Sequence, residues 1–191
     1  MRLRAIPLIV GAILVATAPS GRSQSIPLGG VDLSGLYSLP DAASRNRPED
    51  VKSMLAAGKN PDVADETGQT PLGYASSFGN LAMVQNLLAY HAPVDRRDGF
   101  GNTPLHWAAQ RGTIDVLNAL IDAKASIDLQ NKQGITPLML AASNAQVQAV
   151  RILMQHGADA TKQDYTGRDA VGWANGRPNV LQALKTPRSG G

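Results

Sequence analysis

The sequence has 191 residues, with 18 basic and 15 acidic side chains, and it contains no cysteine. The lack of cysteine excludes disulfide bonds and thiol chemistry, so the fold must depend on its hydrophobic core. Three of the arginines lie within residues 1–23, and removing them from 18 leaves 15 basic residues against 15 acidic ones. This balance lacks the basic surface that nucleic acids require, so we predict no nucleic-acid partner.

The N-terminal segment has the pattern of a secretory leader. A short basic start, Met1–Arg4, precedes an uncharged run over Ala5–Ala18, and small residues follow it. This run is shorter than the ~20 residues that span a bilayer. We therefore predict a signal peptide over 1–23, a linker over 24–31 and a bacterial protein that is periplasmic or secreted. An uncleaved anchor or a disordered tail is the alternative interpretation.

A period of 33 residues organises the rest of the chain. The segment 103–105 reads Thr-Pro-Leu, and the same three residues begin at Thr70 and at Thr136. The threonine can cap a helix, and proline suits the first helical position. Gly112 then supplies a left-handed helix end, and the apolar spacing over 116–121 indicates a second helix.

The repeated unit resembles the ankyrin repeat. Residues 103–108 read Thr-Pro-Leu-His-Trp-Ala, which matches the Thr-Pro-Leu-His-x-Ala signature of that 33-residue turn-helix-helix unit. The resemblance implies an all-α solenoid of about five stacked repeats, with hairpin loops and degenerate terminal caps. The expected repeats are 32–64, 65–97, 98–130, 131–163 and 164–185, followed by a disordered tail over 186–191.

The terminal copies depart from the pattern. Tyr37 and Pro40 stand where threonine and histidine are expected, whereas Pro48 opens a clear second helix. In the last copy, two residues are missing between Trp173 and Gly176. This deletion predicts a shorter inner helix, which suits a terminal cap.

Two positions vary among the central copies. The resemblance implies that the His106 imidazole braces the adjoining turn, and Gly73 and Met139 take its place in the neighbouring copies. We therefore expect those two turns to lack the brace. Ala145 replaces the helix-ending glycine, which predicts local strain because its Cβ disfavours the left-handed conformation.

No pattern of catalytic or metal-binding residues emerges. The three histidines do not share a helix face at metal-ligand spacing. Asp62, Asp95 and Asp128 form a column, but stacked helices lie ~8–10 Å apart while calcium needs oxygens at ~2.3–2.6 Å. We expect these carboxylates to bond turn amides. The prediction is a non-enzymatic protein without cofactor or metal; a hydrolase or metal-dependent enzyme of unrecognised type is the alternative.

The few aromatic residues fall into two groups. Tyr74, Trp107 and Trp173 precede the first alanine of each inner helix, with Leu140 in the fourth copy, and we expect them to pack between helices. The other group lies at turn tips and inner-helix ends, which the resemblance implies form a concave partner-binding face. The predicted partner-binding residues are Phe78, Arg97, Phe100, Arg111, Ile135 and Tyr165.

The sequence therefore predicts a monomeric binding module. Aromatic and arginine side chains are the usual anchors of protein interfaces, although single exposed apolar residues are also normal. We expect a partner protein, whose identity the sequence does not contain, and no membrane contact after the leader is removed. A membrane-tethered scaffold that keeps its leader is the remaining alternative.

Overall fold

The computed structural model describes residues 38–185 and folds them into five consecutive helix pairs. The inner helices, which come first in each pair, are α1 (Leu39–Ser44), α3 (Pro71–Phe78), α5 (Pro104–Arg111), α7 (Pro137–Ser143) and α9 (Ala170–Trp173). The outer helices are α2 (Pro48–Ala56), α4 (Leu81–Ala89), α6 (Ile114–Asp122), α8 (Val147–Gln155) and α10 (Pro178–Ala183). These described residues contain no strand, which confirms the all-α prediction. The predicted signal peptide (1–23), linker (24–31) and tail (186–191) lie outside them.

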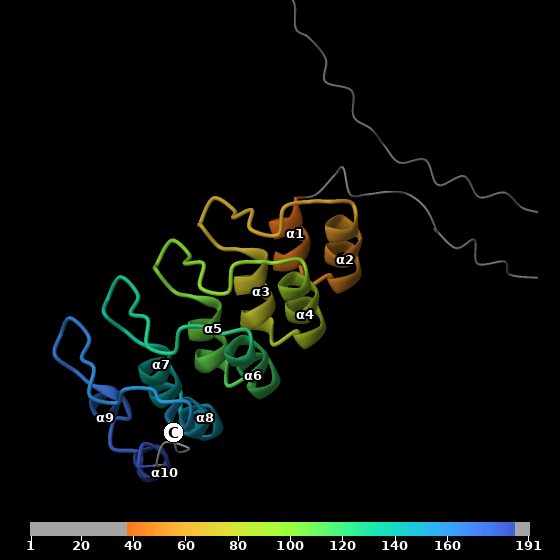
Figure 1. Cartoon of the computed structure of the whole chain (residues 1–191). Coiled ribbons are helices and arrows are strands. Elements are labelled where there is room, and N and C mark those ends of the chain that lie inside the picture. Colours follow the sequence, from red (N-terminus) through yellow and green to blue (C-terminus); the bar gives the residue numbers. More distant parts are fainter. Residues whose placement is uncertain (1–37, 186–191) are drawn as a thin grey trace, which may run out of the picture. The chain divides into compact units, whose positions relative to one another are not determined.

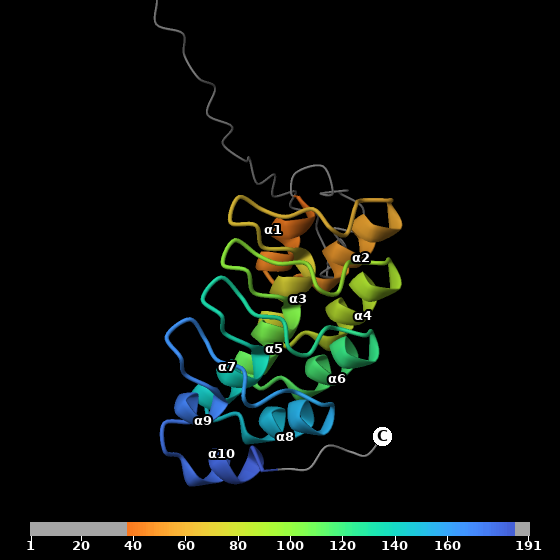
Figure 2. The ribbon, with the colours of Figure 1, turned by 60° about the vertical axis from the view of Figure 1, so that its left-hand side comes forward.

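The helix pairs stack in chain order into a solenoid. Each inner helix contacts the next inner helix along the chain, and the outer helices do the same in a second row. Figure 1 and Figure 2 show the two rows, with hairpin loops projecting from the inner row on one side. Within residues 38–185, every helix falls short of the length and apolarity needed to cross a membrane.

Side-chain caps fix where the inner helices begin. The Thr70 hydroxyl accepts a hydrogen bond from the Gly73 amide at 3.1 Å, and proline fills the first helical position after each capping threonine. The first helix differs from the 33-residue period. It begins one residue later, because Ser38 and Asp41 form a reciprocal capping box with bonds of 3.2 and 3.3 Å. Tyr37 lies outside the described residues.

The last helix pair confirms the predicted shortening. α9 has only four residues, and its first turn is capped by Asp169, which accepts from the Gly172 amide at 2.8 Å. The deletion after Trp173 removes the second half of the inner helix. The chain then turns through Asn175 and Gly176, both in the left-handed region, and enters α10.

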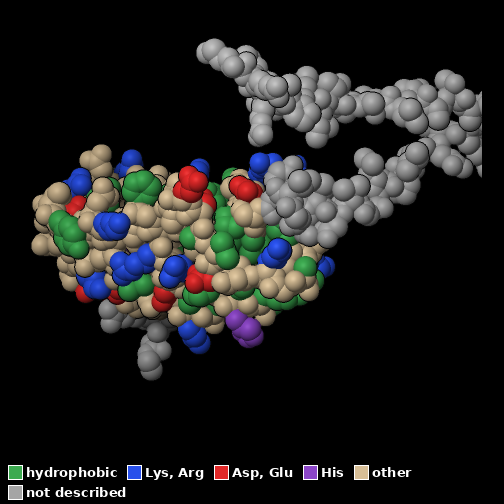
Figure 3. All heavy atoms as spheres, turned by 90° about the horizontal axis from the view of Figure 1, so that it is seen from above, with side chains coloured by type: hydrophobic (Ala, Val, Ile, Leu, Met, Phe, Trp, Pro, Cys, Tyr) green, Lys and Arg blue, Asp and Glu red, His purple; other side chains and the backbone are tan. Residues whose placement is uncertain are grey.

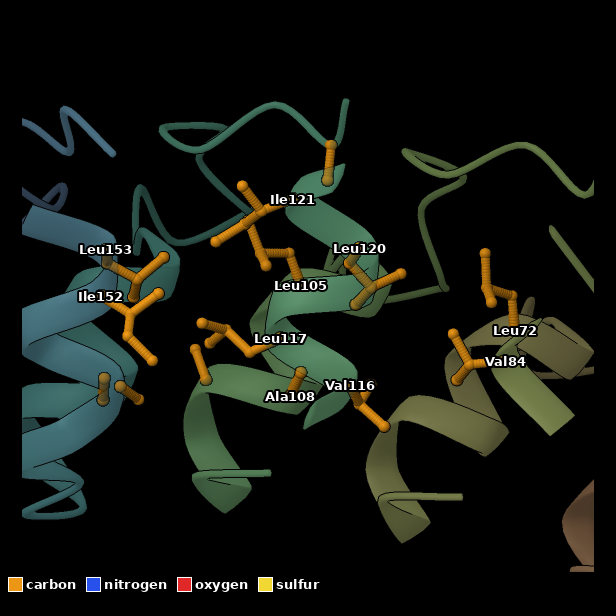
Figure 4. Close-up of a cluster of buried hydrophobic side chains, with 14 of the residues drawn as sticks. Leu72, Val84, Leu105, Ala108, Val116, Leu117, Leu120, Ile121, Ile152 and Leu153 are labelled. Carbon is orange, nitrogen blue, oxygen red and sulfur yellow. The ribbon is translucent and has the colours of Figure 1, made fainter. Parts of the chain in front are cut away.

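The core runs without a break through the stack. Leu105, Leu117 and Leu120 are fully buried, as are their counterparts in the neighbouring repeats. In Figure 4, Leu117 points toward α8, where Ile152 and Leu153 lie, while Leu120 points toward the side of α4. The outer helix α6 therefore packs against both of its neighbours, α4 and α8.

Ala145 takes the left-handed conformation that glycine holds at the equivalent position of the second and third repeats. Its φ is 55°, compared with 69° at Gly112 and 70° at Gly79. An L-residue in this region carries a penalty of ~1–2 kcal/mol, which glycine lacks. We expect Ala145→Gly to stabilise the fold by about 1 kcal/mol, measured by urea denaturation. Ala82→Gly, an exposed position in α4, should instead destabilise it; a change of the same sign in both variants would contradict the strain.

Candidate partner-binding face

Backbone hydrogen bonds link the hairpin tips into a continuous row. The Gly99 amide donates to the Thr67 carbonyl at 3.0 Å, and the Lys132 amide donates to the Phe100 carbonyl at 3.1 Å. The Tyr165 amide continues the row by donating to the Gln133 carbonyl at 3.1 Å. Four successive tips are therefore fixed relative to one another, so side chains on this row start from a preorganised surface.

In most of these turns, an aspartate accepts hydrogen bonds both from backbone amides of the turn and from an aromatic side chain. The Asp98 Oδ1 atom accepts from the amides of Phe100 and Asn102 at 2.8 and 2.9 Å. Its Oδ2 atom accepts from the Trp107 indole nitrogen at 3.0 Å. Asp164 and Trp173 repeat the indole bond at 3.0 Å. The aromatic side chains are therefore held by the turns and are not simply core residues.

The second repeat uses a phenol in the same way. Tyr74 donates its hydroxyl to Asp65 Oδ2 at 2.5 Å. Burial, followed by this hydrogen bond, raises the pKa of Tyr74 to about 12. Burial also raises the pKa of Asp65, but bonds from Thr67, Tyr74 and Gln69 outweigh it and lower the pKa below its ordinary value. The carboxylate therefore remains ionised at neutral pH.

The fourth repeat has a neutral turn residue. Leu140 has no donor to offer at the aromatic position, and the turn residue is Asn131 in place of aspartate. Its Oδ1 atom still accepts from the amides of Gln133 and Ile135 at 2.9 and 3.0 Å. Its amide nitrogen donates to Asn102 Oδ1 at 2.8 Å, which joins two adjacent turns.

His106 braces the next turn, as the family resemblance implies. Its Nε2 atom lies 3.0 Å from the Ile135 carbonyl oxygen, and its Nδ1 atom accepts from the Thr103 amide at 3.1 Å. This geometry assigns the proton of the neutral imidazole to Nε2. Burial lowers the pKa of His106 to about 4, so the ring is neutral at physiological pH.

The two turns without a histidine are filled by other side chains. At Gly73, a Cβ would meet the Gln69 side chain, which occupies the space beside the helix. At Met139, the thioether sulfur accepts from the Thr136 amide at 3.4 Å. Neither residue reproduces the histidine bond to the next turn, so the predicted loss of that brace is confirmed at both positions.

Three clefts lie in a row between the hairpin tips and the inner helices. Cleft 1 is lined by Thr67, Gln69, Tyr74, Asp98, Phe100 and Trp107. Cleft 2 is lined by Phe100, Asn102, Trp107, Gln110, Asn131, Gln133, Ile135 and Leu140. Cleft 3 is lined by Lys132, Gln133, Ile135, Asp164, Tyr165, Thr166, Arg168 and Trp173. We call the surface that these clefts share the groove face.

Four of the predicted residues project into solvent. Phe100 is 70% exposed and separates clefts 1 and 2, and Tyr165 is 75% exposed at cleft 3. Phe78 is exposed at the end of α3. Arg111 is exposed at the end of α5, where it lines a further cleft that shares Trp107 and Gln110 with cleft 2 and that we include in the groove face. These side chains are accessible to a partner.

The other two predicted residues are engaged within the chain. Arg97 donates to the Gln130 carbonyl at 2.7 Å, so its guanidinium already links adjacent repeats. Ile135 is only 7% exposed, because the chain turns back into the stack at this point. It contributes to the floor of clefts 2 and 3 and does not project as an anchor.

Trp107 was not among the predicted partner-binding residues, yet it lines clefts 1 and 2 and the cleft beside Arg111. The expectation that this position packs between helices holds for Tyr74 and Trp173, which pack against the hydrophobic core, whereas Trp107 is half-buried and lines these clefts. A signal for this position exists in the sequence: an indole N–H needs an acceptor when buried. The aspartate nine residues earlier provides it.

The column of Asp62, Asp95 and Asp128 divides into two kinds of contact. Asp95 accepts from the Ser126 amide at 3.0 Å, and Asp128 accepts from the Asp159 amide at 3.1 Å. These bonds to turn amides confirm the prediction at both positions. The residue equivalent to Ser126 one repeat earlier is Pro93, which has no N–H.

Asp62 therefore lacks the amide that its counterparts use. Its Oδ1 atom is buried without a hydrogen bond and lies 3.6 Å from Arg96 Nε, an ion pair that takes the place of the amide. Within residues 38–185, no three histidine, aspartate or glutamate side chains gather in a group that could hold a metal ion.

Comparison with known proteins agrees with this architecture. No curated protein matches the chain. The family model for ankyrin repeats, which describes three copies, matches residues 39–131 and again residues 109–189. Because these matches cover most of the chain and coincide with the helix pairs of residues 38–185, the protein belongs to the ankyrin-repeat family.

Proposed function

We propose that this protein is an exported, monomeric, non-enzymatic scaffold that binds a partner protein through its groove face. Ankyrin repeats are generally protein-interaction modules, and the family is typically non-enzymatic. The binding surface, the partner class and the export are the parts that go beyond the family.

The exposure of Phe100 carries the proposal. A phenylalanine that is 70% exposed leaves much of its apolar surface in water, and it stands between two clefts on a row of hydrogen-bonded tips. Covering it would gain ~25 cal/mol for each Å² of apolar surface. Aromatic residues near the centre of a preorganised surface are the usual binding hot spots.

The mixture of side chains on the protein surface suits a protein partner. On the face seen in Figure 3, hydrophobic, basic and acidic side chains are interspersed. Non-obligate protein interfaces have this mixed character, with an apolar centre and a polar rim.

Removing the aromatic anchor should weaken the complex without unfolding the protein. Once the partner has been isolated by crosslinking or pull-down, we expect Phe100→Ala and Arg111→Ala each to cost ~2 kcal/mol or more, about 30-fold in affinity. Both side chains are exposed, so stability should change by less than ~0.5 kcal/mol. Calorimetric titration and thermal melting measure the two effects.

Matched controls exist on the outer row. Tyr90 is an exposed aromatic at the end of α4, and Arg151 is an exposed arginine on α8; neither lines the clefts of the groove face. Tyr90→Ala and Arg151→Ala should bind as the parent does. Loss of affinity in these controls but not in Phe100→Ala and Arg111→Ala would place the binding surface on the outer helices.

Export rests on the N-terminal sequence, which lies outside the described residues. The basic start, short apolar run and small residues of 1–23 support a cleaved leader. We expect the mature chain to begin between Pro19 and Ser25, as measured by intact mass of the protein from its native host. Retention of Met1 together with membrane association would instead support the tethered scaffold.

A further inference from the structure

Cleft 3 shows how this fold holds a cation next to an indole. The Arg168 guanidinium carbon lies 4.2 Å from the centre of the Trp173 ring, and its Nη2 atom lies 3.3 Å from Asp164 Oδ2. The carboxylate makes this ion pair although Asp164 is only 5% exposed and already accepts from the Trp173 indole. The site thus combines a cation–π contact with an ion pair.

Cleft 1 is the counterpart of cleft 3 two repeats earlier. Asp98 and Trp107 lie 66 residues before Asp164 and Trp173, and they form the same indole-to-carboxylate bond at 3.0 Å. Asp98 is similarly buried, at 8% exposed. The residue at the position of Arg168 is Asn102, however, so the third repeat has no cationic side chain at this position.

Cleft 1 has further features that favour a cation. Tyr74 and Phe100 line it together with Trp107, so three aromatic rings face one cleft, whereas Trp173 and Tyr165 line cleft 3. Its six described lining residues include the Asp98 carboxylate and no lysine or arginine. Aromatic rings grouped around a site are the common way in which proteins bind organic cations.

The charges around cleft 1 agree with this assignment. Asp65, which bonds Tyr74, and the exposed Glu66 add negative charge on the second repeat. Two cations of neighbouring turns are held by backbone carbonyls: Arg97 donates to the Gln130 carbonyl, and Lys132 donates to the Gly99 carbonyl at 2.7 Å. Neither belongs to the lining of the cleft.

We propose that cleft 1 binds the guanidinium group of an arginine side chain on the partner protein, in the way that Arg168 occupies cleft 3. Trp107, Phe100 and Tyr74 provide the aromatic walls, and Asp98 provides the countercharge. This inference rests on the proposed function, since it names the chemistry that the partner inserts into the groove face. Arginine is preferred because its planar guanidinium stacks on aromatic rings and pairs with carboxylates.

The two tryptophans allow a direct test in the full chain. Because the sequence contains only two, each indole N–H gives its own NMR signal, and Trp173 is an internal control. The probe is N-acetyl-arginine methylamide, compared with equal concentrations of sodium chloride and of tetramethylammonium chloride. We expect the arginine probe to shift the Trp107 signal in a saturable way and to leave the Trp173 signal in place.

Two substitutions, each placing in one repeat the residue that the other repeat has at the same position, make the test reciprocal. Arg168→Asn empties the cation position in cleft 3 and should make Trp173 respond to the probe. Asn102→Arg should supply a cation to the third repeat and reduce the response of Trp107. Because Asn102 also accepts from Asn131, Phe100→Leu serves as a second variant that removes an aromatic wall; it should weaken probe binding about 5- to 30-fold.

Several outcomes would overturn the inference. It fails if sodium chloride shifts Trp107 as much as the arginine probe does, if both indoles respond equally in the parent, or if only tetramethylammonium binds. Its failure can be distinguished from failure of the proposed function. A partner could still bind Phe100→Ala more weakly than the parent while the Trp107 signal does not shift with the probe. Conversely, a saturable Trp107 response supports cleft 1 even when no protein partner binds the groove face.

Discussion

Leu120→Ala is expected to lower the free energy of unfolding by about 2–5 kcal/mol. Leu120 is fully buried in α6, which packs against α4 and α8. Truncation removes apolar contacts and leaves a cavity that rigid neighbours fill only in part. Domain stability is usually ~5–15 kcal/mol, so this one change would remove a large share of it.

Urea denaturation followed by circular dichroism measures the change. Asn118→Ala is the matched control, because Asn118 is exposed on the same helix and its truncation should shift stability by less than ~0.5 kcal/mol. If Leu120→Ala and Asn118→Ala unfolded at the same urea concentration as the parent, the continuous core through the third repeat would be wrong.

Acid is expected to weaken the fold through His106. Its folded-state pKa of about 4 lies below the ordinary value of 6.5, because burial disfavours the charged ring. The unfolded chain therefore binds more protons between these two values, and stability falls as the pH drops through that window. This pKa difference corresponds to about 3 kcal/mol of folding stability, which is present in full above pH 6.5 and lost by about pH 4.

The chain itself suggests the control for this effect. Met139 occupies the histidine position in the fourth repeat, so His106→Met uses a side chain that this fold already accommodates. We expect the free energy of unfolding, measured from pH 7 to pH 4, to fall more steeply with decreasing pH in the parent than in the variant. Equal slopes would mean that protonation of His106 is not coupled to unfolding.

The sequence predicts most of the fold because its signals act locally. The capping threonines, the following prolines and Gly112 determine where helices begin and end within a few residues of themselves. The 33-residue period then aligns the copies, so stacking follows from the repeated apolar face. The first helix is the exception, because Ser38 offered a better cap than the period indicated.

The groove face was less predictable, because its contacts join different repeats. Arg97 looks like a free anchor in the sequence, but the carbonyl of Gln130, 33 residues later, binds it. Ile135 sits at a turn in the sequence, yet the stack buries it. Asp62 departs from its column because Pro93, in the next repeat, lacks an amide proton.

Site-specific photo-crosslinking tests the central claim most directly. A photoreactive amino acid would be placed at position 100 on the groove face, or at position 90 at the end of α4, in the protein expressed in its native host. We expect a discrete protein adduct from position 100 that excess unlabelled parent protein competes away, and none from position 90. An adduct from position 90 alone would contradict the assignment of the groove face as the partner-binding surface.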